Sequence, residues 1–430
     1  MLKKLLIVAA LLTVLILIAG VVLWIRQTAP VQHRYFLSNG SILTFNQATF
    51  GTNHVVSAGG RWERILPKFV RSWRKRPGSS SSFTTPSPIV VMWFERSSPA
   101  LGGGQDFTCT LVHADGTEVP FAPSRHFARP TPTNALEGVP TPYPQHEANL
   151  RVRVYEQRNY DTAALLGEFT LRNPQVSRAP IPSAPALPQT SSDGDLRVTL
   201  ESLETAVPRS RWEKTNSLRL WTHARMRVQQ NGVPTANWSP ASVVAIDSTG
   251  AKISSHSWSS GSANEIETLH FQPLLWPSET YKIRFELSRK PTVNFATNET
   301  WTVRGVAVPT NGGFTLVNTQ RNLGAFSIQF HGLNSPSGQP PWDKLYGGEA
   351  SLGFTVTPPP KEHRFTLVRI TDDRGRVVET SGFGSSDTKY GLGIRAKTNA
   401  QFIDFTVALH RSRFVEFNAR PARWDGTFPK

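Results

Sequence analysis

The stretch Phe365–Val378, FTLVRITDDRGRVV, decides the fold class, because it places apolar strand residues on both sides of an acidic-glycine turn. Working outward from it, the same form recurs in Cys109–Phe121 (CTLVHADGTEVPF) and in Ser242–Ile253 (SVVAIDSTGAKI). Acidic residues and glycine are favoured in tight turns, and the flanking residues are typical of strands. A hairpin that recurs at similar spacing predicts a repeated β unit.

Each hairpin is followed by a strand in which apolar and polar residues alternate, which is typical of a sheet with one buried face. The inward residues expected in these strands are Leu150, Val152 and Val154, then Tyr281, Ile283, Phe285 and Leu287, then Ile403, Phe405, Val407 and Leu409. A closing strand then ends each copy near a proline, at Pro174, Pro309 and Pro421.

These patterns predict an all-β protein with three tandem β-sandwich, immunoglobulin-like domains behind one N-terminal transmembrane helix. The 33 prolines, 31 glycines and 18% charged residues favour turn-rich strands over long amphipathic helices. Five prolines between Pro174 and Pro188 predict an extended linker. The expected divisions are an anchor (1–30), a first sandwich (31–174), a proline-rich linker (175–193), a second sandwich (194–309) and a third sandwich (310–430).

Residues Leu5–Ile25 (LLIVAALLTVLILIAGVVLWI) carry no charge and follow Lys3 and Lys4. About 20 apolar residues span a bilayer core, so this stretch predicts a membrane anchor and a lipid bilayer as a partner. A cleaved signal peptide is the alternative, but the apolar run is long for a signal peptide and has Trp24, a residue typical of the membrane interface, near its end. Positive charge before the run favours a cytoplasmic N-terminus, with the β domains outside the cytoplasmic membrane.

The sequence after the anchor first predicts a hairpin, Arg34–Val56, around the tight-turn dipeptide Asn39-Gly40. An amphipathic helix pattern follows in Arg61–Arg76 (RWERILPKFVRSWRKR), interrupted at Pro67. Its apolar residues at helical spacing are Trp62, Ile65, Leu66, Phe69, Val70 and Trp73. This face either packs on the adjacent β domain or lies on an anionic bilayer. In the second case the membrane-surface residues are Trp62, Lys68, Arg71, Trp73, Arg74 and Lys75.

The net charge of +16 is compatible with an anionic partner, such as anionic lipid or an acidic cell-wall polymer. The cations are spread along the chain, so no nucleic-acid partner is expected. The single cysteine, Cys109, excludes an internal disulfide framework. A protein partner is also compatible with these features, but nothing in the sequence identifies it.

Three short motifs, SNGSILTF (38–45), FGTNH (50–54) and WTVRGVAVP (301–309), together with the basic Trp-rich helix, carry a resemblance. With them the chain resembles an uncharacterised family of bacterial proteins that have one N-terminal membrane span. The resemblance covers most of the chain and implies an envelope-anchored protein of repeated β domains. It implies no activity, substrate or catalytic residue.

Residue patterns that carry chemistry are scarce. The sequence contains no HExxH, CxxC or GxSxG pattern, so neither a metal site nor a cofactor is expected. Cys109 is expected in a core strand, where a thiol is usually inert. Paired carboxylates at Asp193/Asp195, Glu265/Glu267 and Asp372/Asp373 could serve a glycosidase, but turn roles are the main interpretation.

Three residues are candidates for ligand binding. Aromatic side chains stack on sugars and cations, and Trp238 and Trp276 lie beside turn signals that favour exposure. His54 is the third candidate, with a role in a hydrogen-bonded turn as its alternative.

The leading hypothesis from these patterns is a non-catalytic, membrane-anchored protein of the bacterial envelope that acts as a spacer or interaction module. A protein that binds glycans or cell-wall polymers through exposed tryptophans and basic residues is the second hypothesis. A hydrolase is the third.

Overall fold

The computed structural model describes residues 33–57, 80–97, 107–113, 116, 118–121, 125–126, 134–157, 163–178, 180–208, 220–250, 252–256, 258–260, 266–271, 274, 280–309, 313–334, 350–386, 388–395 and 400–424. In these ranges the chain is all-β, as the sequence predicts, apart from the 3-10 turn η1, Thr297–Glu299. None of the helical structure described there has the length and apolar character needed to cross a bilayer. The stretches predicted as an anchor, Leu5–Ile25, and as a basic helix, Arg61–Arg76, lie outside the described residues.

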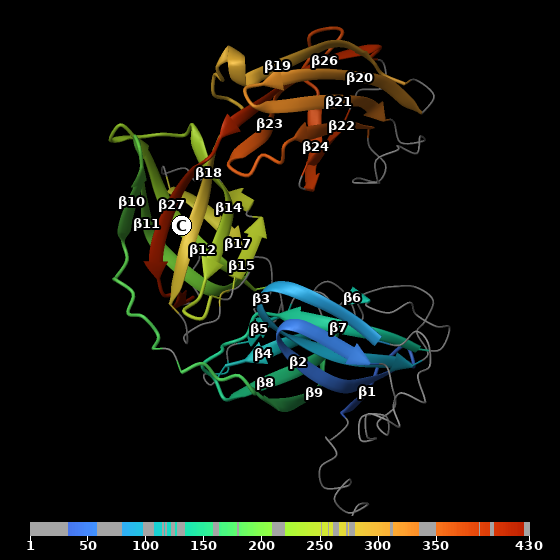
Figure 1. The fold of residues 1–430 in the computed structure, drawn as a ribbon, viewed down its shortest axis with the longest axis vertical. Helices are drawn as coiled ribbons and strands as arrows, with labels where there is room; N and C mark the ends of the chain where they lie inside the picture. The colour runs from blue at the N-terminus through green and yellow to red at the C-terminus, as the bar shows by residue number, and fades with distance from the viewer. Residues whose placement is uncertain are drawn as a thin grey trace, which may run out of the picture.

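The described strands form six sheets, which we name A to F (Figure 1). Sheets A and B make up the N-terminal pair and are both antiparallel. Sheet A has the order β1 (Arg34–Phe36), β2 (Ile42–Ser57), β3 (Ser80–Ser97), β7 (Asn134–Thr141), β6 (Arg125–His126). Sheet B has the order β5 (Glu118–Pro120), β4 (Phe107–Val112), β8 (Asn149–Gln157), β9 (Ala163–Arg172).

The alternation in the sequence explains why sheets A and B pack face to face. Along β8, Leu150, Val152 and Val154 are buried, whereas the alternating residues Arg151 and Arg153 are partly exposed. The buried residues join those of sheet A, such as Met92, in a shared core. The predicted inward face of β8 is therefore confirmed.

Sheets C and D form the middle pair. Sheet C has the order β10 (Gln189–Asp193), β11 (Leu196–Pro208), β12 (Leu220–Gln230), β17 (Ile266–Phe271), β16 (Trp258–Ser260). Two short strands extend it, β13 (Val233–Pro234) beside β12 and β28 (Ala422–Arg423) parallel to β11. Sheet D has the order β15 (Lys252–His256), β14 (Trp238–Ile246), β18 (Tyr281–Arg289), β27 (Arg413–Ala419).

Sheets E and F form the C-terminal pair around a core of their own. Sheet E has the order β19 (Thr300–Ala307), β26 (Phe402–Arg411), β23 (His363–Asp372). Sheet F has the order β20 (Phe314–Leu323), β21 (Phe326–Asn334), β22 (Ala350–Thr357), β25 (Lys389–Arg395), β24 (Glu379–Ser386). Aromatic rings fill the space between them, with Phe405 of sheet E 4.9 Å from Phe330 of sheet F between ring centroids.

The closing strands of the second and third sequence units are exchanged relative to the prediction. β19 (Thr300–Ala307) pairs with β26 of sheet E, and β27 (Arg413–Ala419) pairs with β18 of sheet D. The C-terminal pair is therefore inserted into the middle pair, and the chain returns to complete sheet D. Alternation specifies which face of a strand is buried, but it does not specify which sheet the strand completes.

The expected turns are present. Gly40 adopts a φ of +81° between β1 and β2, as the predicted hairpin around Asn39-Gly40 requires. The carboxylate of Asp372 accepts hydrogen bonds from the backbone N–H groups of Arg374 and Arg376. This aspartate therefore has the turn role expected for it.

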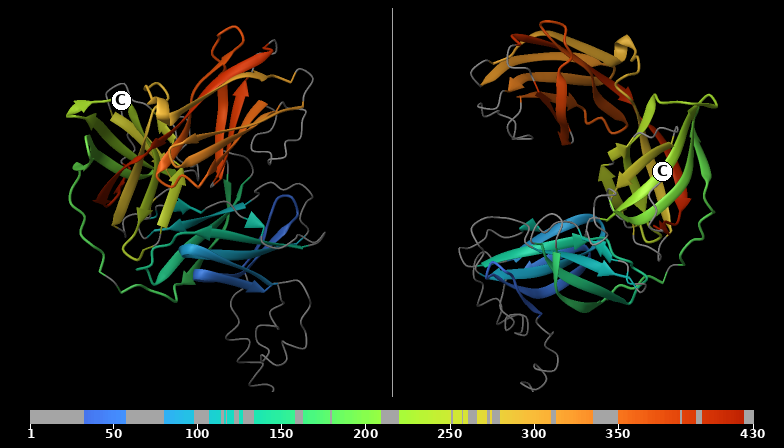
Figure 2. Two further views of the ribbon diagram at one scale, coloured as in Figure 1. Left: turned by 45° about the horizontal axis from the view of Figure 1, so that its top comes forward. Right: turned by 180° about the vertical axis from the view of Figure 1, so that it is seen from behind.

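The middle pair lies between the other two pairs along the chain's long axis in Figure 1 and in the right-hand view of Figure 2. The chain from Asn173 to Pro188 contains no strand among its described residues and connects the N-terminal pair to the middle pair. It contacts both pairs, because the Ser177 N–H donates to the carbonyl of Gln145 and the Thr280 hydroxyl donates to the carbonyl of Pro182.

Candidate functional site

The junction between the middle and C-terminal pairs is organised around Glu286 on β18. Its carboxylate accepts two hydrogen bonds from Arg364 of β23, from Nε at 3.0 Å and from Nη2 at 3.2 Å. The hydroxyls of Ser412 and Ser242 donate to the same carboxylate at 2.7 and 2.5 Å. Four chain segments therefore meet at one side chain.

The charge state of Glu286 follows from these contacts. Burial alone would raise the pKa of the Glu286 carboxyl. The charge of Arg364 and the hydrogen bonds from Ser242, Ser412 and Arg364 outweigh burial, so the pKa lies below its ordinary value. Glu286 is therefore ionised at neutral pH and holds Arg364 by a charge-assisted, two-point contact.

A second cluster at the same junction involves the chain that leads from β18 to β19. Arg289 forms an ion pair with Glu299, and its guanidinium lies 4.8 Å from the centroid of the Phe295 ring. Phe295 in turn contacts His410 of β26, with ring centroids 5.2 Å apart. Burial, as the largest cause, lowers the pKa of His410 to about 4. The His410 imidazole is therefore neutral at physiological pH.

The N-terminal and middle pairs also share polar contacts. His146 lies between them, with Nε2 2.9 Å from the hydroxyl of Ser248 and Nδ1 3.2 Å from the carbonyl of Ser177. The hydroxyl of Ser87 on β3 donates to the carbonyl of Lys252 on β15 at 3.5 Å. Both ends of the middle pair are thus tied to its neighbours.

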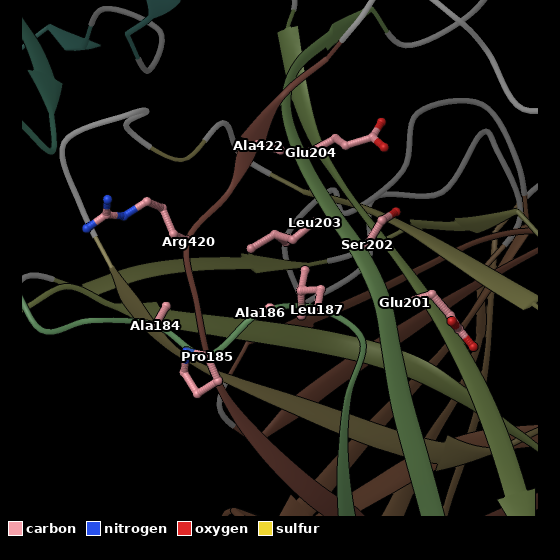
Figure 3. Close-up of a pocket in the computed structure, with 10 residues that line it drawn as sticks. All are labelled: Ala184, Pro185, Ala186, Leu187, Glu201, Ser202, Leu203, Glu204, Arg420 and Ala422. Atoms are coloured by element: carbon pink, nitrogen blue, oxygen red, sulfur yellow. The ribbon is translucent and has the colours of Figure 1, made fainter.

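A cavity of about 370 Å³ lies in the middle pair, beside the linker (Figure 3). Its apolar lining includes Leu187 and Leu203, and Arg420 and Glu204 are at its rim. Arg420 extends away from Glu204 in Figure 3, so the charged groups do not converge on a common point. His54 and Trp238, the two predicted ligand-binding residues that the structure describes, do not line this cavity.

His54 lies in the strand β2 and is fully buried, so it does not have the turn position considered in the sequence. Its Nδ1 is 2.8 Å from the Thr49 hydroxyl, which also accepts a hydrogen bond from the Trp93 indole N–H at 2.9 Å. The Thr49 hydroxyl is therefore the shared hydrogen-bonding partner of the indole and the imidazole. Burial lowers the pKa of His54. This neutral histidine has no exposed atom for a ligand.

Trp238 is buried, with 7% of its surface exposed, and belongs to the core of the middle pair. The prediction that it is exposed and available for stacking on a ligand is wrong. Its neighbours Asn237 and Pro240 mark the start of β14, but they do not determine which face of the strand Trp238 occupies. Trp276 lies outside the described residues, as do the membrane-surface candidates Trp62, Lys68, Arg71, Trp73, Arg74 and Lys75.

Three more of the carboxylate candidates, Asp193, Asp195 and Glu267, are held in ion pairs. Asp193 and Asp195 both contact the guanidinium of Arg413, at 3.2 and 3.3 Å. Glu267 contacts the ammonium of Lys290 at 2.9 Å. These contacts agree with structural roles for the three side chains.

Two histidines that the sequence did not single out lie side by side on sheet C. His223 of β12 is the register partner of His270 of β17, and their ring centroids are 4.2 Å apart. Burial and the neighbouring His270 lower the pKa of His223 to about 3. The two histidines are 47 positions apart in the sequence, so no local motif could reveal the pair.

In the part of the chain that the structure describes, no group of three His, Cys, Asp or Glu side chains is placed to hold a metal ion.

Comparison with known proteins identifies no relative: no protein-family model, no curated protein and no solved structure matches this chain.

Proposed function

We propose that the protein is a membrane-anchored, non-catalytic protein of a bacterial envelope that acts as a spacer or interaction module. In this proposal the three pairs of sheets are immunoglobulin-like sandwich domains, with the third inserted into the second. The apolar stretch Leu5–Ile25 supports the anchor and the extracytoplasmic location of the β domains.

The observation that carries the spacer proposal is the convergence of four chain segments on Glu286. A spacer has to keep its domains at a fixed orientation, which a single flexible linker does not do. Here two chain crossings connect the middle and C-terminal pairs, one before β19 and one at Ser412. The bidentate contact between Glu286 of sheet D and Arg364 of sheet E adds a further connection beside the crossing at Ser412 and opposes rotation of the two pairs.

The alternative hypothesis of glycan binding has lost one of its two tryptophans, because Trp238 is buried. A hydrolase is also supported less well than a spacer, because Asp193, Asp195 and Glu267 are held by Arg413 and Lys290. Both hypotheses remain alternatives that binding and activity assays on the full chain can test.

The spacer proposal is tested by measuring distances between spin labels in sheets D and F of the full chain. We expect one narrow distance distribution in the native protein and a broader one in Glu286→Gln, which removes the charge that holds Arg364. The matched control is Arg411→Gln, because Arg411 and Glu362 form an exposed contact at 3.8 Å nearby. A broad distance distribution in the native protein would contradict the spacer role.

The extracytoplasmic location of the β domains is tested separately with a reporter fused to the C-terminus. A reporter that is active only in the cytoplasm would contradict that location.

A further inference from the structure

The outer face of sheet A carries a buried apolar cluster. Val91 and Trp93 of β3 alternate with Val90, Met92 and Phe94, which belong to the core shared with sheet B. Side chains alternate between the two faces of a strand, so Val91 and Trp93 point away from sheet B. Both are nevertheless fully buried.

Other strands extend the same cluster. Val56 near the end of β2 is fully buried, Leu136 of β7 is 4% exposed, and Phe83 packs against them. The opposite face of an antiparallel sheet is commonly solvated, and a charged or polar surface would be expected there. Because sheet B occupies the other face and β2 and β7 flank β3 within the sheet, other parts of the chain must cover this cluster.

The chain itself supplies an apolar segment at this position. Ser57 at the end of β2 and Ser80 at the start of β3 are register partners, so residues 58–79 leave and re-enter sheet A at the same point. That point adjoins Val56 and Phe83 of the buried outer-face cluster. The connection contains Arg61–Arg76, the amphipathic pattern whose apolar side is formed by two tryptophans, isoleucine, leucine, phenylalanine and valine.

We propose that the apolar side of Arg61–Arg76 docks on the outer face of sheet A, over Val91 and Trp93, rather than in a lipid bilayer. Two features support this segment as the one that covers the cluster. Both the outer-face cluster and one side of the Arg61–Arg76 pattern are apolar, and only a few residues separate the pattern from sheet A at either end. Docking of the apolar side requires the basic side of the pattern, with Arg64, Lys68, Arg71, Arg74 and Lys75, to be turned away from sheet A. The inference is independent of the proposed spacer function.

Thiol labelling of the full chain in nanodiscs tests this proposal. Native Cys109 is fully buried, and burial raises the pKa of its thiol well above the ordinary value. It should therefore not react with the label in the native protein. A cysteine is introduced either on the apolar side, in Leu66→Cys, or on the basic side, in Arg71→Cys. Ile65→Cys serves as a second apolar-side variant if Leu66→Cys does not fold.

In nanodiscs of zwitterionic lipid, we expect the apolar-side thiol to react with maleimide at least about tenfold more slowly than the basic-side thiol, as buried sites do. Anionic lipid should leave this ratio unchanged. Adding Val91→Ser should speed labelling of the apolar-side thiol. Val55→Ser is the matched control, because Val55 is 61% exposed at the same end of β2. It should leave the labelling rate of the apolar-side thiol unchanged.

Equal labelling rates of the two thiols in zwitterionic discs would overturn the proposal. Protection that appears only with anionic lipid would also overturn it, because the apolar side would then lie in the bilayer. Neither result would affect the distance measurements between sheets D and F that test the spacer function.

Discussion

Arg364 on β23 and Glu286 on β18 join the C-terminal pair of sheets to the middle pair by two parallel hydrogen bonds. Their side chains are 26% and 18% exposed, so the contact is partly shielded from solvent. Because Ser242 and Ser412 use the same carboxylate, loss of Arg364 leaves an ionised and only partly compensated group.

The first prediction concerns the stability of this junction. Arg364→Gln should lower the free energy of unfolding by about 1–2 kcal/mol, between the values typical of exposed and buried ion pairs. Urea titration at pH 7 measures the change. Arg411→Gln is the matched control, because the Arg411–Glu362 contact is largely exposed and should change stability by less than about 0.5 kcal/mol. Equal effects of the two variants would contradict the importance of the Glu286 junction.

The second prediction concerns Gly332 in the bulged strand β21. Its φ is +146°, and a Cβ atom there would lie 2.0 Å from the carbonyl oxygen of Thr315. Gly332→Ala should therefore destabilise the C-terminal pair by about 2–4 kcal/mol through backbone strain and overpacking. Thermal unfolding of the variant measures the loss.

Gly324→Ala is the control for Gly332. Gly324 also has a positive φ, +59°, but a Cβ atom there meets nothing within 4 Å. The control should lose only about 1–2 kcal/mol, the cost of a left-handed conformation. If both variants lost the same stability, the close approach of Thr315 would not be the cause.

The sequence predicted the local features of the fold well. Alternation in Leu150–Val154 identified the buried face of β8, and Asn39-Gly40 identified the turn between β1 and β2. Both signals are local, because strand alternation and turn conformation are determined by residues within a few positions of one another in the sequence. Long-range pairing has no such local signal. This explains why the strand that ends near Pro421 was expected to close the third unit, whereas β27 completes sheet D of the middle pair.

The candidate site was less predictable for the same reason. Glu286 and Arg364 are 78 positions apart and meet because two strands from different sheets are brought together. His223 and His270 likewise meet through strand register. Trp238 was predicted to be exposed from its turn-forming neighbours, whereas the packing of sheets C and D decides its burial.

The third prediction concerns Thr49, whose hydroxyl joins the Trp93 indole to His54. Thr49→Val keeps the size of the side chain but removes the hydrogen-bonding partner of both the Trp93 indole and the His54 imidazole. The variant should lose about 1–3 kcal/mol of stability, the cost of leaving buried polar groups unsatisfied. Thr190→Val is the control, because the Thr190 hydroxyl contact with Thr199 is exposed and should contribute little. Equal losses in urea titrations would contradict the role of the buried Thr49 hydroxyl.

The fourth prediction is that acid destabilises the protein before its carboxylates titrate. The pKa of His223 is about 3 and that of His410 about 4 in the folded protein, against an ordinary value of 6.5. The unfolded chain therefore binds more protons below pH 6.5, so the stability present at neutral pH is lost as the pH falls. Between pH 7 and pH 5 each histidine should reduce the free energy of unfolding by about 2 kcal/mol.

Urea titrations at pH 7, 6 and 5 measure this loss. His223→Gln should reduce it by about 2 kcal/mol, and the remainder comes from the other histidines with a lowered pKa, which are His54, His331, His363 and His410. The range ends at pH 5, since Glu286, whose ordinary pKa is 4.5, stays ionised above that pH in both states. A free energy of unfolding that is constant from pH 7 to pH 5 would mean that His223 and His410 gain protons as readily in the folded protein as in the unfolded chain. Their burial on sheets C and E would then not be the cause of a lowered pKa.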